Sequence, residues 1–245
     1  MLPVLHLGPL AIQTPGLIIL LGAGLGLTVM ERQAARYQVN GGLLYNTVFL
    51  GLLAGIVGAR LAFAIHYLSA FRANPANLLS LNLSMFEPAW GIIIALVASA
   101  FFGWKKHLPL RHTLDAFTSA LAVFVIAFHL AQFTSGDAYG AATTLPWAID
   151  LWGAHRHPVQ IYEALAAILI LWILWPRPGW YAIAGQRFLA FIAMSAGARL
   201  FLEVFRGDSV LWDGIRSAQV ISWLIMAFCL WILNKLSVTQ NREPN

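Results

Sequence analysis

The chain has 245 residues, of which 60% are apolar and only 10% are charged, and its mean hydropathy is +0.73. Because soluble globular domains carry about 25% charged residues, this composition excludes an ordinary soluble domain and predicts an outer surface that faces lipid. The net charge is +5, but the cations lie in short loops between apolar runs, where they orient a membrane protein rather than bind nucleic acid. We therefore predict one membrane domain over residues 1–245, with no nucleic-acid partner.

Seven apolar runs are long enough to cross a bilayer, for which a helix needs about 20 residues. Helices are expected because lipid offers the backbone no hydrogen-bond partners. The chain is therefore predicted to be an all-α membrane protein, a bundle of about seven transmembrane helices. The predicted spans cover residues 10–30, 46–70, 88–104, 113–133, 159–176, 184–205 and 217–235.

The loops between these spans differ in their content of Lys and Arg. Loops on one side of the predicted bundle hold nine of these cations, Arg187 among them, and loops on the other side hold four. Since the more positive side is cytoplasmic, the N-terminus is predicted outside and the C-terminus in the cytoplasm. The single cysteine, Cys229, lies in an apolar run, and no spacing of Cys and His residues predicts a metal site.

Ionisable side chains inside the predicted spans are the first candidates for a functional site, because they cost several kcal/mol unless they face a cavity or a partner. Arg199 and Glu203 are four residues apart in the sixth span, and Arg206 follows three residues later, so the three share one face. This face is either an ion pair that neutralises itself or a site for an anionic head group in which Glu203 holds an arginine. Arginine suits phosphate because its planar fork donates two parallel hydrogen bonds.

The densest polar cluster opens the fifth span. His157, Gln160 and Glu163 follow one another at intervals of three residues, so they face one way, and Pro158 suits the first turn of a helix. Glu163 lies at least one turn inside the membrane and therefore needs a buried cation as a partner. The candidates for this partner are Arg60, Arg199 and Arg206.

Two further charged residues in the spans have open or simpler interpretations. Arg60, in the second span, either binds a helix C-terminus or a carboxylate, or lines the same cavity as the other arginines. Asp115 follows Thr113 by two residues at a predicted helix start. Helix capping is sufficient to explain an acidic side chain at that position.

The motif at the fifth span carries a family resemblance. The run His157–Glu163 reads His-Pro-Val-Gln-Ile-Tyr-Glu and is similar to the His-Pro-x-Gln-x-Tyr-Glu motif of the prolipoprotein diacylglyceryl transferases of bacterial inner membranes. The residues Arg199, Glu203 and Arg206 resemble that family's sixth-span pattern. The resemblance runs in order from about residue 46 to residue 235, and it extends to the segments 55–61, 139–140 and 144–147 and to Gln219 and Ser222.

The resemblance implies a reaction and a set of site residues. Such enzymes move a diacylglyceryl group from phosphatidylglycerol to the thiol of a lipobox cysteine in a prolipoprotein signal peptide, with no cofactor, as multi-pass proteins of the bacterial inner membrane. The implied catalytic residues are His129, Arg199, Glu203 and Arg206. The implied substrate-binding residues are Arg60, Gln132, Asp137, Tyr139, Gly140, His157, Gln160, Tyr162 and Glu163.

One stretch departs from the family pattern. The family signature reads Gly-Arg-x-Gly-Asn-Phe-x-Asn-x-Glu, and of it the segment Phe128–Asp137 keeps only Phe133. His129 stands where the signature has arginine, Gln132 and Ser135 replace asparagines, and Asp137 replaces glutamate. These changes leave two alternatives to the standard activity. One is a related membrane transferase with a different acceptor, and the other is a non-catalytic protein that binds or transports phospholipid on the same scaffold.

Overall fold

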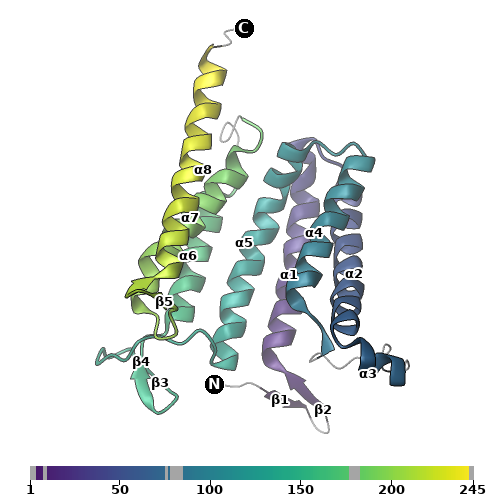
Figure 1. Cartoon of the computed structure of the whole chain (residues 1–245). Helices are drawn as coiled ribbons and strands as arrows, with labels where there is room; N and C mark the ends of the chain where they lie inside the picture. The colour runs from purple at the N-terminus through teal and green to yellow at the C-terminus, as the bar shows by residue number, and fades with distance from the viewer. Residues whose placement is uncertain (1–3, 8–9, 75–76, 78–84, 177–182, 243–245) are drawn as a thin grey trace. The chain divides into compact units, whose positions relative to one another are not determined.

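The computed structural model describes residues 4–7, 10–74, 77, 85–176 and 183–242, and each of the seven predicted spans overlaps one long apolar helix (Figure 1). Residues 10–13 of the first predicted span form a strand instead, and residues 68–70 of the second belong to a separate short helix. Six of these helices are long and apolar enough to cross a membrane, and α6 is a shorter apolar helix. The all-α class is thus confirmed, while the orientation of the termini stays a prediction. The helices are α1 (Thr14–Ala34), α2 (Gly41–His66), α4 (Pro88–Lys105), α5 (Leu110–Ser135), α6 (Val159–Ile173), α7 (Gln186–Leu202) and α8 (Ser217–Arg242).

Short elements connect the long helices. Three antiparallel hairpins pair β1 with β2, β3 with β4, and β5 with β6. A short helix and two 3-10 turns complete the described elements, and η4 directly continues α7. Their bounds are β1 (Val4–Leu7), β2 (Leu10–Gln13), η1 (Ala35–Tyr37), α3 (Leu68–Ala73), β3 (Ile149–Leu151), β4 (Ala154–Arg156), η4 (Glu203–Phe205), β5 (Leu211–Trp212) and β6 (Ile215–Arg216).

The chain forms two compact units, and the prediction of one membrane domain stays a prediction. One unit covers residues 33–113 and contains α2 and α4. The two helices approach closely because glycines face each other: a Cβ on Gly55 would lie 2.9 Å from the carbonyl oxygen of Gly91, and a Cβ on Gly91 would lie 3.1 Å from that of Gly55. Small residues at such contacts let helix backbones pack in lipid.

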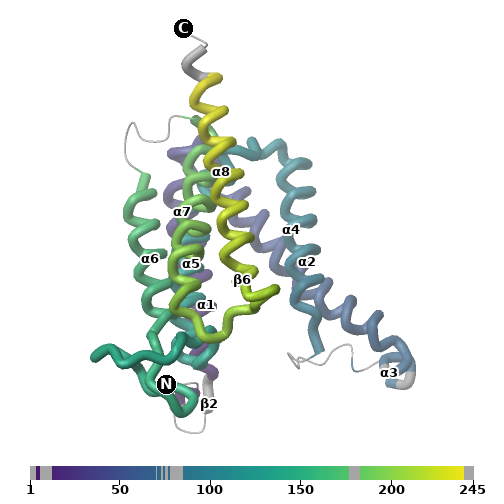
Figure 2. Tube along the Cα trace, turned by 60° about the vertical axis from the view of Figure 1, so that its left-hand side comes forward, coloured from purple at the N-terminus to yellow at the C-terminus, as the bar shows by residue number. Residues whose placement is uncertain are grey.

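The other unit covers residues 1–32 and 114–245 and contains the helices that bear most of the predicted site residues. Figure 2 shows α6, α7 and α8 next to one another in this unit. A small apolar core joins α5, α6 and α7 through Ala122, Ile170, Leu174 and Phe191, all at most 5% exposed. This core fixes the three helices whose polar side chains meet further along the bundle.

A buried polar contact fastens the start of α7 to α5, and it corrects two expectations. Asp115 does not cap its own helix, because its carboxylate accepts hydrogen bonds from the backbone N–H groups of Gly185 (2.6 Å) and Phe188 (2.9 Å) at the start of α7. Arg187 is not a solvated loop cation but is fully buried, and it donates to the carbonyls of Leu174 and Asp115 and to the hydroxyl of Ser119. The first turn of α7 is thereby satisfied by side chains from α5.

Replacing Asp115 with Ala should therefore lower the stability of the folded protein. The change leaves two backbone N–H groups at the start of α7 without their acceptor, which costs about 1–3 kcal/mol per buried group. Thermal unfolding of the detergent-solubilised protein measures the loss as a lower Tm. The control is Asp150→Ala, because the Asp150 side chain is 82% exposed. Equal Tm values for the two variants would contradict the assigned role of Asp115.

A buried charge cluster as the candidate functional site

Three groups from three elements converge on the carboxylate of Glu163 in α6. Nη1 of Arg199 lies 2.7 Å from Oε1, Nη1 of Arg206 lies 3.1 Å from the same oxygen, and Nδ1 of His129 lies 3.1 Å from Oε2. The Glu163 side chain is only 4% exposed. The expectation of a buried cation beside Glu163 is confirmed for Arg206, whose side chain is 9% exposed, and Arg199 also pairs with Glu163 although it is only partly buried.

Two more carboxylates complete what we call the Glu163 cluster. Oε2 of Glu203 lies 2.8 Å from Nη2 of Arg199 without the alignment of a hydrogen bond, and 3.9 Å from Nε of Arg206. Asp208 accepts two hydrogen bonds from Arg206, from Nε at 2.9 Å and from Nη2 at 2.6 Å. The members of the Glu163 cluster are His129, Glu163, Arg199, Glu203, Arg206 and Asp208.

Electrostatics keeps Arg206 charged despite its burial. Burial alone would lower the pKa of this guanidinium. The hydrogen bonds to Asp208 and the charge of Glu163 outweigh that effect, so the pKa of Arg206 is raised above its ordinary value. Arg206 is therefore a permanent positive charge in the cluster.

A backbone contact between two loops positions Arg206. Gly140 forms an isolated antiparallel bridge with Arg206, and the N–H of Ala141 donates to the carbonyl of Phe205 at 2.7 Å. The approach requires glycine, because a Cβ on Gly207 would lie 2.6 Å from the carbonyl oxygen of Gly140. The loop before α6 thus holds the turn after α7 in place.

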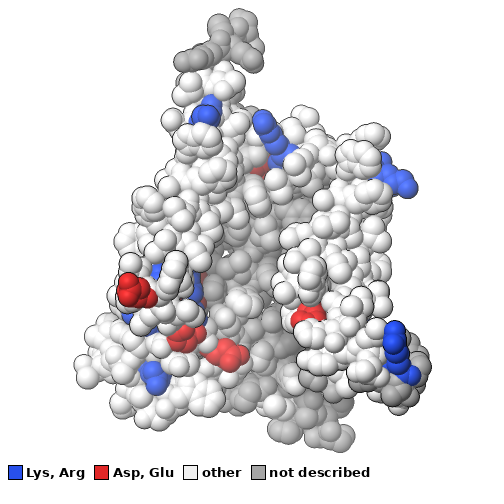
Figure 3. All heavy atoms as spheres, in the orientation of Figure 1, with Lys and Arg blue, Asp and Glu red and all other residues white. Residues whose placement is uncertain are grey.

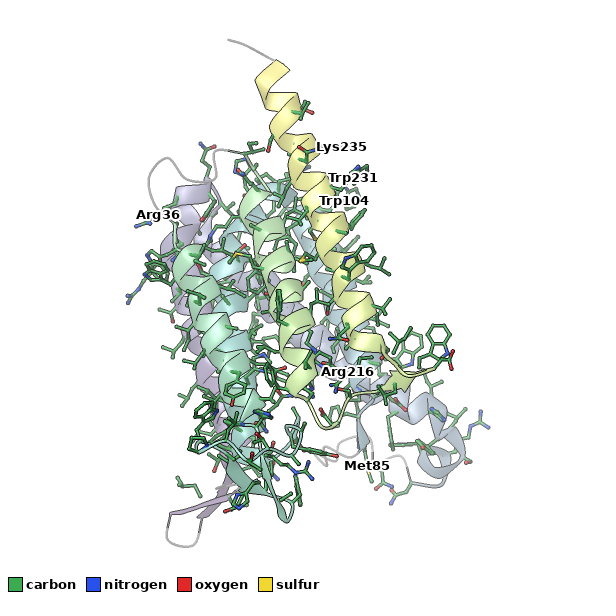
Figure 4. All side chains as sticks on the ribbon, turned by 90° about the vertical axis from the view of Figure 1, so that its left-hand side faces the viewer. Arg36, Met85, Trp104, Arg216, Trp231 and Lys235 are labelled. Carbon is green, nitrogen blue, oxygen red and sulfur yellow. The ribbon has the colours of Figure 1, made fainter. Side chains whose placement is uncertain are left out.

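Arg216 also holds this turn, a role that its position in a predicted loop did not indicate. Its Nη1 donates to the carbonyls of Glu203 and Arg206 and to the hydroxyl of Ser209. Figure 4 shows Arg216 at the start of α8, beside the end of α7. A cation counted as a loop charge is therefore a structural clamp on two residues of the Glu163 cluster.

His129 has a defined hydrogen-bonding direction. Its Nδ1 faces two oxygens, Oε2 of Glu163 at 3.1 Å and Oε1 of Gln132 at 3.1 Å. Since a carboxylate only accepts hydrogen bonds, Nδ1 is the nitrogen that carries the proton, an assignment made from the hydrogen-bond network. In the neutral ring the lone pair is then on Nε2. A neutral His129 in this setting is a base whose orientation is fixed by a carboxylate.

A cleft opens beside the cluster. His129, Glu163 and Arg199 line one part of it, and Ser195 of α7 contributes a hydroxyl. The remaining lining is apolar and consists of Val125, Ala166, Ala167, Ile170, Ala198 and Leu202. Arg199 is the more accessible of the two arginines, with 34% of its side chain exposed against 9% for Arg206. Arg199 is therefore paired with carboxylates, as one interpretation of the sixth-span face expected, and it also lines an open space, while its binding of an anionic head group stays a prediction.

Most of the other predicted site residues of this unit lie at the start of α6 and in the loop that precedes it. Gln160 is fully buried and donates from Nε2 to the carbonyl of Asp137 at 2.7 Å, while the Asp137 carboxylate accepts from Ser135. The rings of His157 and Tyr162 pack with Phe205. Tyr139 lies under the guanidinium of Arg156, 4.7 Å from the ring centroid, and its carbonyl accepts from Gly207.

Arg60 belongs to the other unit. Its guanidinium donates to the carbonyls of Met85 (2.6 Å) and Asn77 and lies over the rings of Phe71 and Phe86. These contacts tie the end of α2 to the segment that precedes α4. None of the interpretations open from the sequence named these backbone carbonyls as partners of Arg60, and a role of Arg60 in substrate binding stays a prediction.

The fold and the cluster define a class: a helical protein with membrane-length spans and a buried arginine–carboxylate site beside an apolar cleft. The family model for prolipoprotein diacylglyceryl transferase matches residues 3–234, and the chain belongs to this family. It is 30% identical to a protein of Bordetella parapertussis, over 92% of this chain and 90% of that one. It is 28% identical to a protein of Finegoldia magna, over 86% of this chain and 86% of that one. It is 29% identical to a protein of Solidesulfovibrio magneticus, over 96% of this chain and 94% of that one. All three relatives are named phosphatidylglycerol–prolipoprotein diacylglyceryl transferase.

Replacing Glu163 with Ala should destabilise the protein strongly. Removing one partner of a buried ion pair costs about 3–5 kcal/mol, because the remaining charge is buried without compensation. Glu163→Gln keeps an acceptor for Arg199 and should cost less. The midpoint of thermal unfolding in detergent ranks the variants, with Glu31→Ala on the exposed surface of α1 as the control. If Glu163→Ala unfolds at the wild-type temperature, the cluster does not depend on this carboxylate.

Proposed function

We propose that this protein moves the diacylglyceryl group of phosphatidylglycerol to the thiol of a lipobox cysteine in a prolipoprotein, in the inner membrane of a bacterium. Family membership and the names of the relatives support this proposal. The observation that carries it is the convergence of Arg199, Arg206 and His129 on one carboxylate at the edge of an apolar cleft.

The reaction sets three chemical demands. A C–S bond forms between the cysteine sulfur and the terminal glyceryl carbon, and the bond from that carbon to the phosphate oxygen breaks. Glycerol phosphate leaves with the electron pair, so positive groups have to stabilise its growing charge. The thiol proton passes to a base, because the thiolate is the reactive nucleophile. The protein therefore has to offer a phosphate site, a base and room for two acyl chains.

Arg199 is the residue we assign to the phosphate. It lines the cleft, about a third of its side chain is exposed, and it forms ion pairs with the carboxylates of Glu163 and Glu203. A guanidinium has five N–H donors, so Arg199 can hold these carboxylates and still donate to a phosphodiester. Arg206 differs, because Nε and Nη2 are occupied by Asp208 and Nη1 by Glu163. Arg206 supplies a fixed positive field rather than direct contacts.

His129 is the residue we assign to the thiol proton. Its Nδ1 is oriented by Glu163, and the ring lines the cleft. The free lone pair on Nε2 can then accept a proton from the cysteine thiol, and the imidazolium that forms is stabilised by the same carboxylate. The apolar lining from Val125 to Leu202 provides contact for acyl chains.

A second candidate is a transferase with a different acceptor, and a specific observation favours it. His129 occupies the position where the family signature has arginine, so this cleft has one permanent cation fewer than that signature would give. A changed polar lining alters which group is held beside the lipid. Identification of the product distinguishes the two acceptors, whereas a measurement of lipid binding does not.

The test is an assay of the purified protein with phosphatidylglycerol vesicles and a lipobox peptide. The wild type should produce the thioether-linked diacylglyceryl peptide. Arg199→Ala should slow its formation by about 10²–10³-fold, the usual effect of removing a donor that stabilises transition-state charge. Mass spectrometry of the peptide measures the product.

The matched control is Lys235→Ala, which removes a cation near the end of α8 and should leave the rate unchanged. If the wild type consumes phosphatidylglycerol but leaves the peptide unmodified, the acceptor is another molecule. If it consumes no lipid under conditions in which an authentic transferase works, the protein does not catalyse the reaction.

The variant His129→Arg distinguishes two possible roles of position 129, acceptance of the thiol proton and binding of the phosphate. The change restores the residue of the family signature and supplies a permanent cation, but it removes the base. If His129 accepts the thiol proton, the rate should fall by about 10²–10⁴-fold, the typical contribution of a general base, while phosphatidylglycerol still binds. A rate equal to or above wild type would mean that position 129 serves the phosphate instead. Binding is measured with fluorescent phosphatidylglycerol, and the rate with the peptide assay.

A further inference from the structure

The connection between α7 and α8 contains a tight hairpin that plays no part in the proposed reaction. Strands β5 and β6 pair with Leu211 opposite Arg216 and Trp212 opposite Ile215. The two loop residues, Asp213 and Gly214, both have positive φ, 49° and 78°. Such a two-residue loop gives a hairpin a fixed register and twist. The side chains on its two faces are therefore held in defined directions.

The two faces of this hairpin differ in what they contact. On one face, Arg216 reaches back to the carbonyls of Glu203 and Arg206 and holds the hairpin against the turn after α7. On the opposite face, Trp212 and Ile215 form a pair that is 81% and 58% exposed. Val210 and Leu211 are also exposed, by 71% and 61%. Within this unit the hairpin thus presents large apolar side chains away from its own fold.

The exposed apolar side chains continue into the surface of the adjoining spans. Ser217, the first residue of α8, follows β6 directly and donates its N–H to the carbonyl of Val210. The first turns of α8 expose Val220, Ile221, Trp223 and Leu224 by 45–56%. Figure 2 shows β6 projecting from the start of α8, and Figure 3 shows charged atoms of both signs at that end of α7 and α8. An apolar surface that runs on from membrane-length helices has lipid as its natural contact.

We propose that the face of the β5–β6 hairpin formed by Trp212 and Ile215 binds the head-group zone of the bilayer. The depth follows from the residue types. Tryptophan favours the boundary between water and hydrocarbon. The carboxylate of Asp213 at the hairpin tip is costly in the hydrocarbon core, so it keeps the hairpin from going deeper. The hairpin therefore lies flat in the interface instead of inserting tip first.

This placement has a consequence for access to the cluster. Arg216 is a member of the hairpin and contacts the backbone of both Glu203 and Arg206. A hairpin resting on the lipid surface holds the turn that carries Arg206 at the level of the phospholipid head groups. The membrane contact thus sets the depth at which a lipid phosphate meets the charge cluster.

Site-specific fluorescence tests the proposal with the full-length protein. The single cysteine, Cys229, is buried and is first replaced by Ala. Two variants are then made, Trp212→Cys and Ile215→Cys, and an environment-sensitive label is attached to the new cysteine of each. The labelled proteins are reconstituted separately in phosphatidylcholine bilayers. The matched control is Asp150→Cys on the β3–β4 hairpin, where the wild-type side chain is 82% exposed. Lipids with a doxyl quencher near the glycerol backbone, lipids with one near the chain ends, and aqueous iodide are compared.

Labels at 212 and 215 should lose most emission to the shallow doxyl lipid, less to the deep one and little to iodide, whereas the label at 150 should be quenched by iodide. Iodide quenching at 212 and 215 as strong as at 150, with no effect of doxyl lipids, would mean that this face does not contact the bilayer. Stronger quenching by the deep lipid would overturn the interfacial depth. Two label positions on one face guard against a local effect of a single substitution.

Discussion

One carboxylate organises the candidate site. Glu163 is almost fully buried, and it faces two guanidinium groups and an imidazole that come from different elements. Charges in such surroundings persist only when they compensate one another, because desolvation of each alone costs several kcal/mol. A single side chain thus links α5, α6 and the end of α7. Loss of that side chain affects the geometry of every group around it.

The compensation also determines what the site can accept. Arg199 and Arg206 face the carboxylates of Glu163, Glu203 and Asp208, and Arg216, which binds the backbone carbonyls of Glu203 and Arg206, adds a third positive charge nearby, so the formal charges of these groups balance. A phosphodiester brings one further negative charge. Transfer of the thiol proton to His129, as proposed above, would leave a thiolate in place of the thiol, so it would not change the net charge of the site. The cations of the cluster would therefore face both the phosphodiester and the thiolate.

Much of this arrangement follows from periodicity. The helices coincide with the apolar runs because bilayer thickness and backbone hydrogen bonding leave few other solutions. The pairing of Arg199 with Glu203 follows from their spacing of four residues. The need of Glu163 for a buried cation follows from its depth, although the sequence offered three candidates and could not choose among them. Each of these inferences rests on regular helix geometry.

The contacts that the sequence did not reveal all depend on where loops and helix ends meet. Asp115 binds the start of a helix that begins about seventy positions later, and no local pattern marks that contact. Arg216 reaches carbonyls across an irregular connection, and the approach of Gly140 to Gly207 joins two loops. In each case the partner is backbone, which carries no residue-specific signal. A cation counted as a loop charge can therefore bind and hold a neighbouring turn, which a count of charges in loops does not reveal.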